Sequence, residues 1–204
     1  MKKTITTLLL LSCITAFSFA QSIVMTSGTI DFIKDQQVIQ FTFSYDEMLV
    51  GKLTESEYVD KKSSEYNAKE EGKGDQWKAA WYGDRKERFE PKFLELFDKY
   101  MSEVGITAGT EGDQYRIEIN TDFTEPGWNV GVMRQNASVD LSCKVKKIET
   151  GEQVASIRIR NPSANNFWGT DFTSGYRVQE TYAKAGRELA KFFIKKAKLR
   201  KIKD

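Results

Sequence analysis

Residues 136–160 alternate between apolar and polar side chains, in a pattern typical of a β-hairpin. In the first arm every second residue is apolar, and these positions are Ala137, Val139, Leu141, Cys143 and Val145. The second arm repeats the alternation at Ala155, Ile157 and Ile159. Because successive side chains of a strand point to opposite faces, this period of two predicts one buried face and one solvated face. The polar residues 149–152 between the arms suit a short hairpin connection.

Other segments follow a helical pattern. Thr54 and Glu57 have the spacing of a capping box, which predicts that a helix begins there. Within 93–101 the apolar side chains recur with the i, i+3, i+4, i+7 spacing of a core-facing helix. Pro91 suits the first turn of that helix, so we expect a helix boundary just before it. A final helix is predicted from about residue 175 to residue 194, with an apolar stripe along one side.

Two more strands are predicted over 38–45 and 115–120, so the order of elements along the chain is β-α-α-β-β-β-α. Three consecutive antiparallel strands with helices packed on one face define an α+β fold with an antiparallel sheet. Residues 21–204 suit a single domain of this kind, which ends in a basic C-terminal helix and tail.

Residues 1–20 have the organisation of a secretory signal peptide. Two lysines precede an apolar stretch, and Ser18 and Ala20 supply the small residues of a cleavage site. The mature chain would then begin at Gln21 and be exported to the periplasm or secreted. Lipid attachment at Cys13 is the alternative, and it would anchor the protein to the outer membrane. No later segment has the length and apolarity of a membrane span.

Composition removes several kinds of chemistry. The chain contains no histidine, which excludes Ser-His-Asp and Cys-His catalysis and zinc sites that need histidine. Cys143 follows the apolar face of the hairpin, which indicates a small buried hydrophobe and not a nucleophile. Since no catalytic, phosphate-binding or metal-binding motif occurs, we expect no enzyme, no cofactor and no metal. Carboxylate-based hydrolysis needs no motif and stays open, with candidates at Glu118, Asp122, Glu125 and Asp171.

Charge is balanced overall but uneven along the chain. Without the two lysines of the leader, 29 basic and 29 acidic residues remain, which argues against nucleic acid as a partner. Residues 176–204 carry 10 basic and 3 acidic residues. Such a run is typically a frayed, solvated tail. Weak contact of the C-terminal helix with an anionic surface is the alternative interpretation.

Two aromatic and polar loops, 124–131 and 161–173, form the candidate binding site. The predicted meander directs both loops to the same end of the sheet, because alternate strands run in opposite directions. The candidate ligand-binding residues are Trp128, Asn129, Asn166, Phe167, Trp168 and Asp171. Aromatic faces beside amide and carboxylate groups suit a sugar or peptide, whereas the alternative is that these rings close the end of the core. Trp77 and Trp81, one helical turn apart, allow the same two interpretations, and their spacing favours core packing.

The order of elements from Gln37 onward, which ends in antiparallel strands and the helical segment 182–190, resembles small envelope domains of the TolB N-terminal type. Such domains also occur in curli-secretion and penicillin-binding-protein-activator lipoproteins. The aromatic helical insert 77–89 departs from that layout. The resemblance implies a non-catalytic module of the cell envelope that binds a protein partner, although fold analogy cannot by itself establish function.

We therefore expect an exported, non-catalytic interaction or binding module of the cell envelope. The first alternative is a carbohydrate- or peptidoglycan-binding domain that uses the two aromatic loops. The second alternative is a carboxylate-based hydrolase. The partner, whether an envelope protein or a glycan, and the oligomeric state are left open by the sequence.

Overall fold

The computed structural model describes residues 22–202, except 113, 130–132 and 164–172. An antiparallel meander forms the centre of the sheet, and its strands are β6 (Tyr115–Glu125), β9 (Ser138–Lys147) and β10 (Gln153–Ser163). The predicted leader lies outside the described residues. The hairpin and its register confirm the interpretation of the alternating pattern in 136–160.

Three further strands widen the meander: β1 (Ser22–Gly28), β2 (Val38–Ser44) and β5 (Thr107–Gly109). The order across the sheet is β1-β10-β9-β6-β2-β5. β1 pairs antiparallel with β10, whereas β2 runs parallel to both β6 and β5. β2 can pair parallel with β6 because helices connect the two strands. Parallel pairing requires a long crossover connection of this kind. The α+β class is confirmed, and the sheet is antiparallel except at this edge.

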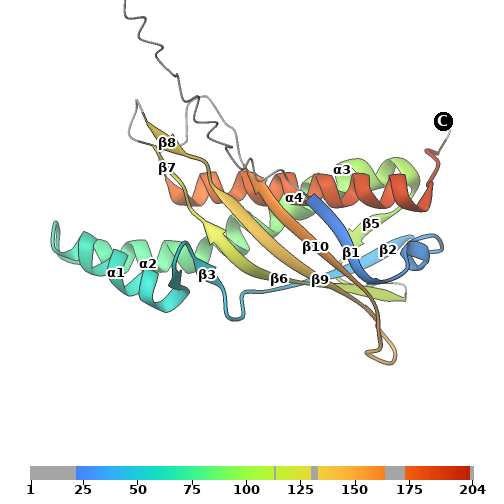
Figure 1. Ribbon diagram of the computed structural model, residues 1–204, viewed down its shortest axis with the longest axis horizontal. Helices are drawn as coiled ribbons and strands as arrows, with labels where there is room; N and C mark the ends of the chain where they lie inside the picture. The colour runs from blue at the N-terminus through green and yellow to red at the C-terminus, as the bar shows by residue number, and fades with distance from the viewer. Residues whose placement is uncertain (1–21, 113, 130–132, 164–172, 203–204) are drawn as a thin grey trace, which may run out of the picture.

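The helices of the body are α3 (Glu90–Met101) and α4 (Ser174–Ala197), which lie side by side over the inner face of the sheet. α1 (Glu55–Asn67) and α2 (Lys73–Asp84) extend beyond the sheet as a helical hairpin (Figure 1). The remaining elements are short, and they are η1 (Ile30–Ile33), β3 (Leu49–Val50), β4 (Leu53–Thr54), η2 (Arg85–Phe89), η3 (Ser102–Val104), β7 (Trp128–Asn129) and β8 (Arg134–Gln135). The predicted order of strands and helices is therefore present, but the sequence pattern did not predict the edge strand β1 or these short elements.

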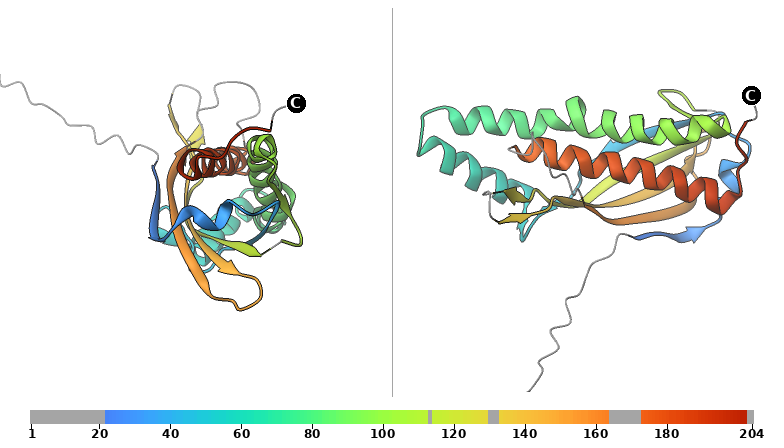
Figure 2. Two further views of the ribbon diagram at one scale, coloured as in Figure 1. Left: turned by 90° about the vertical axis from the view of Figure 1, so that its right-hand side faces the viewer. Right: turned by 90° about the horizontal axis from the view of Figure 1, so that it is seen from above.

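A π-helical turn, η2, joins α2 to α3 in one continuous rod (Figure 2). Pro91 lies in the first turn of α3, as predicted, where its missing N–H is least costly. An ordinary α-helix that ran unbroken through this point would place the proline ring against the carbonyl of the turn before it. The wider π turn just before Pro91 relieves that conflict, so the boundary changes the winding of the helix and does not interrupt it.

The core lies between the sheet and the pair α3 and α4. The inward side chains of the meander are almost fully buried, as the alternation predicted, and they include Ile117, Ile119, Val139, Leu141, Val145, Ile157 and Ile159. Cys143 is also buried, and burial raises the pKa of its thiol to about 12, which confirms its role as a small hydrophobe. A second, smaller cluster lies at the base of α1 and α2 and consists of Met48, Val50, Val59 and Trp81.

Gly186 sets the distance between α3 and α4. A Cβ atom at this position would overlap the backbone carbonyl oxygen of Phe93 on the neighbouring helix. Phe93 is itself fully buried, and its ring contacts Phe41 and Phe43 on the sheet. A side chain at Gly186 would therefore push α3 away from α4 and loosen the packing of Phe93 on the sheet.

We predict opposite effects for the same substitution at two helical glycines. Gly186→Ala should lower the free energy of unfolding by about 2 kcal/mol, because the new methyl group overpacks the α3–α4 contact. Gly83→Ala is the matched control, since its Cβ would meet only the flexible Glu87 side chain, at 3.6 Å. Because alanine has a higher helix propensity than glycine, Gly83→Ala should raise the free energy of unfolding by up to about 1 kcal/mol. Urea unfolding followed by circular dichroism measures both, and equal effects would contradict the close packing at Gly186.

Candidate functional site

The helical hairpin α1–α2, which we call the aromatic arm, begins with the predicted capping box. Thr54 Oγ1 accepts a hydrogen bond from the Glu57 N–H at 3.3 Å, and Glu57 Oε2 accepts one from the Thr54 N–H at 2.9 Å. At the far end of the arm, Gly72 adopts a left-handed conformation with φ of 78° and turns the chain into α2. Asn67 Oδ1 accepts a hydrogen bond of 2.6 Å from the Gly74 N–H. The two helices are thus joined by a closely bonded turn.

The aromatic rings of the arm form a ladder from the core to the solvent. Trp81 is buried, and Trp77 stacks on it with ring centroids 5.6 Å apart. Tyr66 lies against Trp77 at 5.8 Å, and Tyr58 contacts both tryptophans. Trp77 and Tyr66 are only partly buried. Stacking on the buried Trp81 therefore holds flat apolar surface in place at the side of the arm.

Glu55 fastens the base of the arm. Its Oε1 accepts a hydrogen bond of 2.7 Å from Trp81 Nε1 and forms an ion pair with Arg85. The Arg85 guanidinium lies 4.1 Å from the centre of the Tyr45 ring, which belongs to the body of the protein. These contacts make the orientation of Trp81 depend on both helices of the arm and on the sheet.

Trp128 lies on the short ribbon of β7 and β8, which forms the opposite wall. Its side chain is 40% exposed, and Nε1 donates a hydrogen bond of 3.0 Å to Gln135 Oε1. Arg177 of α4 holds the base of the ribbon, since Nε and Nη2 donate to the carbonyl oxygens of Pro126 and Gly127, both at 3.0 Å. Two bonds from one planar guanidinium fix the direction of the turn that presents Trp128.

The first turn of α4 completes the site. Asp84, at the end of α2, lies so close to Gly175 that any Cβ there would overlap its carboxylate. A negative charge at this place complements the positive pole of the helix. Burial raises the pKa of the Asp84 carboxyl, and an ion pair of 2.6 Å with Arg88 opposes that shift. Arg88 also lies over the ring of Tyr176, with 4.3 Å from guanidinium carbon to ring centroid.

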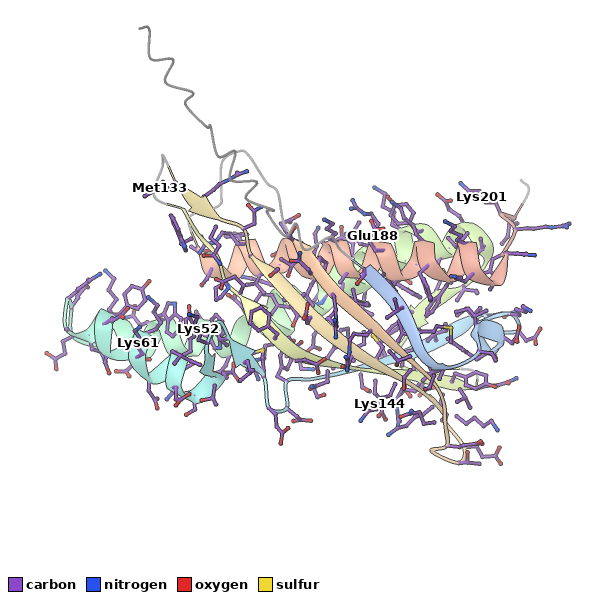
Figure 3. All side chains as sticks on the ribbon, viewed as in Figure 1. Lys52, Lys61, Met133, Lys144, Glu188 and Lys201 are labelled. Carbon is purple, nitrogen blue, oxygen red and sulfur yellow. The ribbon has the colours of Figure 1, made fainter. Side chains whose placement is uncertain are left out.

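These parts enclose a cleft of about 440 Å³, between the arm, the β7–β8 ribbon and the start of α4. In Figure 3 the labelled Lys61 shows where α1 lies, and the labelled Met133 shows where the ribbon lies. Aromatic side chains line the cleft together with three cations and, among its described lining residues, one carboxylate. The charged residues are Lys62, Arg88, Arg177 and Asp84. Burial raises the pKa of the Tyr58 hydroxyl, also in the lining, to about 12, so this group stays a neutral donor near neutral pH.

The structure tests the predicted loop site in part. The register brings Glu125, Ser138 and Ser163 together, so both loops leave the same end of the sheet, as the meander predicted. Trp128 lines the cleft. The side chain of Asn129 and the whole of residues 166–168 and 171 lie outside the described part of the chain. Trp128 is therefore the predicted site residue whose side chain the structure describes, and it lines the same cleft as Tyr66 and Trp77.

Several lining residues were not predicted from the sequence. Tyr58, Lys62 and Tyr66 follow one another at intervals of four, which places them on one side of α1. That spacing could have indicated, from the sequence, a surface shared by these three side chains. The packing interpretation is confirmed for Trp81, which is buried in the second cluster, and Trp77 packs against that cluster. Both side chains also line the cleft, so a binding role for them stays a prediction.

The acidic candidates for hydrolysis have structural partners. Glu118 forms ion pairs with Arg116 and Lys146 on the outer face of the sheet, at 2.8 and 2.7 Å. Asp122 accepts hydrogen bonds from Ser142 and Asn120, and Glu125 Oε1 accepts one from the Gly127 N–H at 3.0 Å. Asp171 lies outside the described residues. Within the described part of the chain, no group of three or more acidic, cysteine or histidine side chains is placed to hold a metal ion.

Comparisons with known proteins leave the family open. No family model matches the chain, and no curated protein matches it. Among solved structures, a PelC dodecamer from Paraburkholderia phytofirmans matches 84% of this chain and 98% of its own, with 10% identity and a TM-score of 0.39. A single-residue variant of that dodecamer matches 81% and 96%, with 8% identity and a TM-score of 0.35. Similarity at this level carries no argument about function. Among the described residues, no helix combines the length and apolarity needed to cross a bilayer.

We predict that Arg177 positions the wall that carries Trp128. Arg177→Met keeps the bulk of the side chain but removes both bonds to the ribbon, and should lower the free energy of unfolding by about 1–2 kcal/mol. It should also change the tryptophan emission of the folded protein. Arg187→Met is the matched control on the same helix, because the ion pair that Arg187 forms among the described residues is with the neighbouring Glu188, at a partly exposed site. If the two variants behaved alike in urea unfolding and emission, Arg177 would have no positioning role.

Proposed function

We propose that this protein is a non-catalytic binding module of the bacterial cell envelope, and that it binds a saccharide in the aromatic cleft. The observation that carries the proposal is the pairing of partly exposed rings across a cleft, with Trp77 and Tyr66 on the arm and Trp128 on the ribbon. Such rings bind the apolar faces of sugar units, and charged groups between them bind hydroxyl or carboxylate groups.

The dimensions and chemistry of the cleft support this assignment. Its volume falls in the range of small-ligand sites, which is about 300–1,000 Å³. Its walls are built on secondary structure, Trp77 stacks on the buried Trp81, and Arg177 holds the turn before Trp128, so little ordering is needed when a ligand enters. A hydrolase would need a second carboxylate near Asp84, and the described lining residues include no other. This favours binding over hydrolysis.

The cellular place of the protein follows from the predicted leader. Residues 1–20 carry the features of a secretory signal, so a glycan of the envelope is the saccharide that the exported protein would meet. A protein partner, which the resemblance to envelope domains implies, would then use surfaces outside the cleft.

The test is titration of the chain that begins at Gln21 with a panel of neutral and acidic oligosaccharides, including peptidoglycan fragments. At least one should change the tryptophan emission, because Trp77 and Trp128 line the cleft. Unchanged emission over the whole panel would refute saccharide binding. Calorimetry with a saccharide that binds then measures the affinities of the two variants described next.

We predict that Trp128→Ala lowers the affinity for that saccharide about tenfold, through loss of one stacking face. Tyr82→Ala is the control, since Tyr82 is comparably exposed at 39% and lies on α2 but outside the cleft. It should leave the affinity unchanged. Circular dichroism checks that both variants are folded, and an equal loss of affinity in the two would place binding elsewhere.

A further inference from the structure

The C-terminal end of α4 carries a group of exposed cations, which we call the basic end: Lys195, Lys196, Lys198 and Arg200. Among the described residues, none of the four forms an ion pair with a carboxylate, whereas the next cation, Lys201, pairs with Glu103 at 2.6 Å. The two lysines inside the last helical turn complement the negative pole of α4. That role does not extend to Lys198 and Arg200, which follow the helix.

The basic end is held in place and is not the frayed tail that the sequence favoured. Lys198 ends the helix in a left-handed conformation with φ of 55°, and the Leu199 N–H donates to Ile194 O at 3.0 Å. Further on, the Ile202 N–H donates to Glu103 O at 2.9 Å. The chain after α4 therefore folds back along η3, and its cations lie at defined places as far as residue 202.

An apolar side chain lies at the same end. Ile202 is 64% exposed, the largest exposed fraction among the exposed large hydrophobic residues of the described chain. Lipid surfaces with anionic headgroups attract clusters of lysine and arginine, and an aliphatic side chain next to such a cluster can enter the boundary between headgroups and acyl chains. We propose that the basic end docks on an anionic lipid bilayer.

The placement of the basic end is compatible with the cleft. α4 has 24 residues and is about 36 Å long. Its first turn lines the cleft, whereas its last turn carries the cations, near the C-terminal mark of Figure 1 and the labelled Lys201 of Figure 3. Docking would leave the cleft open on the side away from the bilayer. Docking at the basic end does not depend on what the cleft binds.

A second group of cations provides a charge-matched control. Lys144, Arg158 and Arg160 are exposed on the outer face of the sheet, and no ion pair to them occurs among the described residues. Glu118 and Asp140 lie directly opposite Lys144 and Arg160 in the register, so the field of this face is partly cancelled. Lys144 is labelled in Figure 3, near the hairpin end of the sheet.

The experiment measures flotation of the protein with vesicles. The chain that begins at Gln21 is used, because the predicted leader is itself apolar and all described elements follow it. Vesicles of phosphatidylcholine with a third of phosphatidylglycerol should bind the protein at low salt, and pure phosphatidylcholine should not. Added salt should weaken binding, since the attraction is screened over about 10 Å at 0.1 M.

Three variants test the assignment. Lys195→Gln, Lys196→Gln and Arg200→Gln together should reduce vesicle binding on the order of 100-fold. The same change at Lys144, Arg158 and Arg160 alters net charge equally and should leave most binding intact. Ile202→Asn should reduce binding without a change in charge, whereas binding of soluble polyphosphate should not depend on Ile202.

Each result decides the proposal. Preference for anionic vesicles, with loss confined to the basic end and to Ile202, supports docking on a bilayer. Equal loss in the two triple variants would mean that binding follows net charge alone, and would refute the proposal. Unchanged vesicle binding in Ile202→Asn, with polyphosphate as an efficient competitor, would assign the basic end to a soluble polyanion.

Discussion

The architecture depends on the contact at Tyr182, where α4, the sheet and the helical rod meet. This side chain is fully buried, its hydroxyl bonds to Thr121 Oγ1 at 2.6 Å, and its ring stacks on Phe89 with centroids 5.1 Å apart. Burying a hydroxyl group without a hydrogen-bond partner costs free energy. The bond therefore favours the one rotation of α4 about its axis that directs Tyr182 toward Thr121. Phe89 belongs to the π turn, so the stacking also attaches this part of the helical rod to α4. Gly186, one turn further on, then permits α3 to approach α4 closely.

The aromatic arm is an extension of that body and does not share its core. Its own cluster is small, with Met48, Val50, Val59 and Trp81, and its connection to the body runs through the Glu55–Arg85 pair and the Tyr45 ring. Such an element gains little from apolar burial alone, so polar anchors decide its direction. The same anchors orient Trp81, and through stacking they orient Trp77. The aromatic lining of the cleft is therefore a consequence of how the arm is attached.

α4 connects the two surfaces that the structure brings forward. Its first turn meets Asp84 and carries Arg177 at the cleft, and the basic end lies in and just after its last turn. The helix poles explain part of this division, because a carboxylate suits the start of a helix and lysines suit its end. A chain in which basic and acidic residues are nearly equal in number can in this way present a strongly basic end. The net charge of the chain therefore does not reveal that its basic residues are concentrated at one end of α4.

The sequence by itself determined the hairpin, the buried face of the meander, the burial of Cys143, the cap at Thr54 and the final helix. Each of these follows from a local period or a local hydrogen bond, which depends on residues a few positions apart. Only the tertiary structure decided that β1 joins the sheet, that β2 runs parallel, and that the arm and the ribbon face each other. Arg177 bonds to carbonyl groups 50 and 51 residues earlier, and no local pattern encodes that distance. Trp128 was predicted as a site residue from its loop, and Trp77 was considered for the same role. That Tyr66 and Trp77 lie against each other and line the same cleft as Trp128 depends on two helices folding together, which no local pattern encodes.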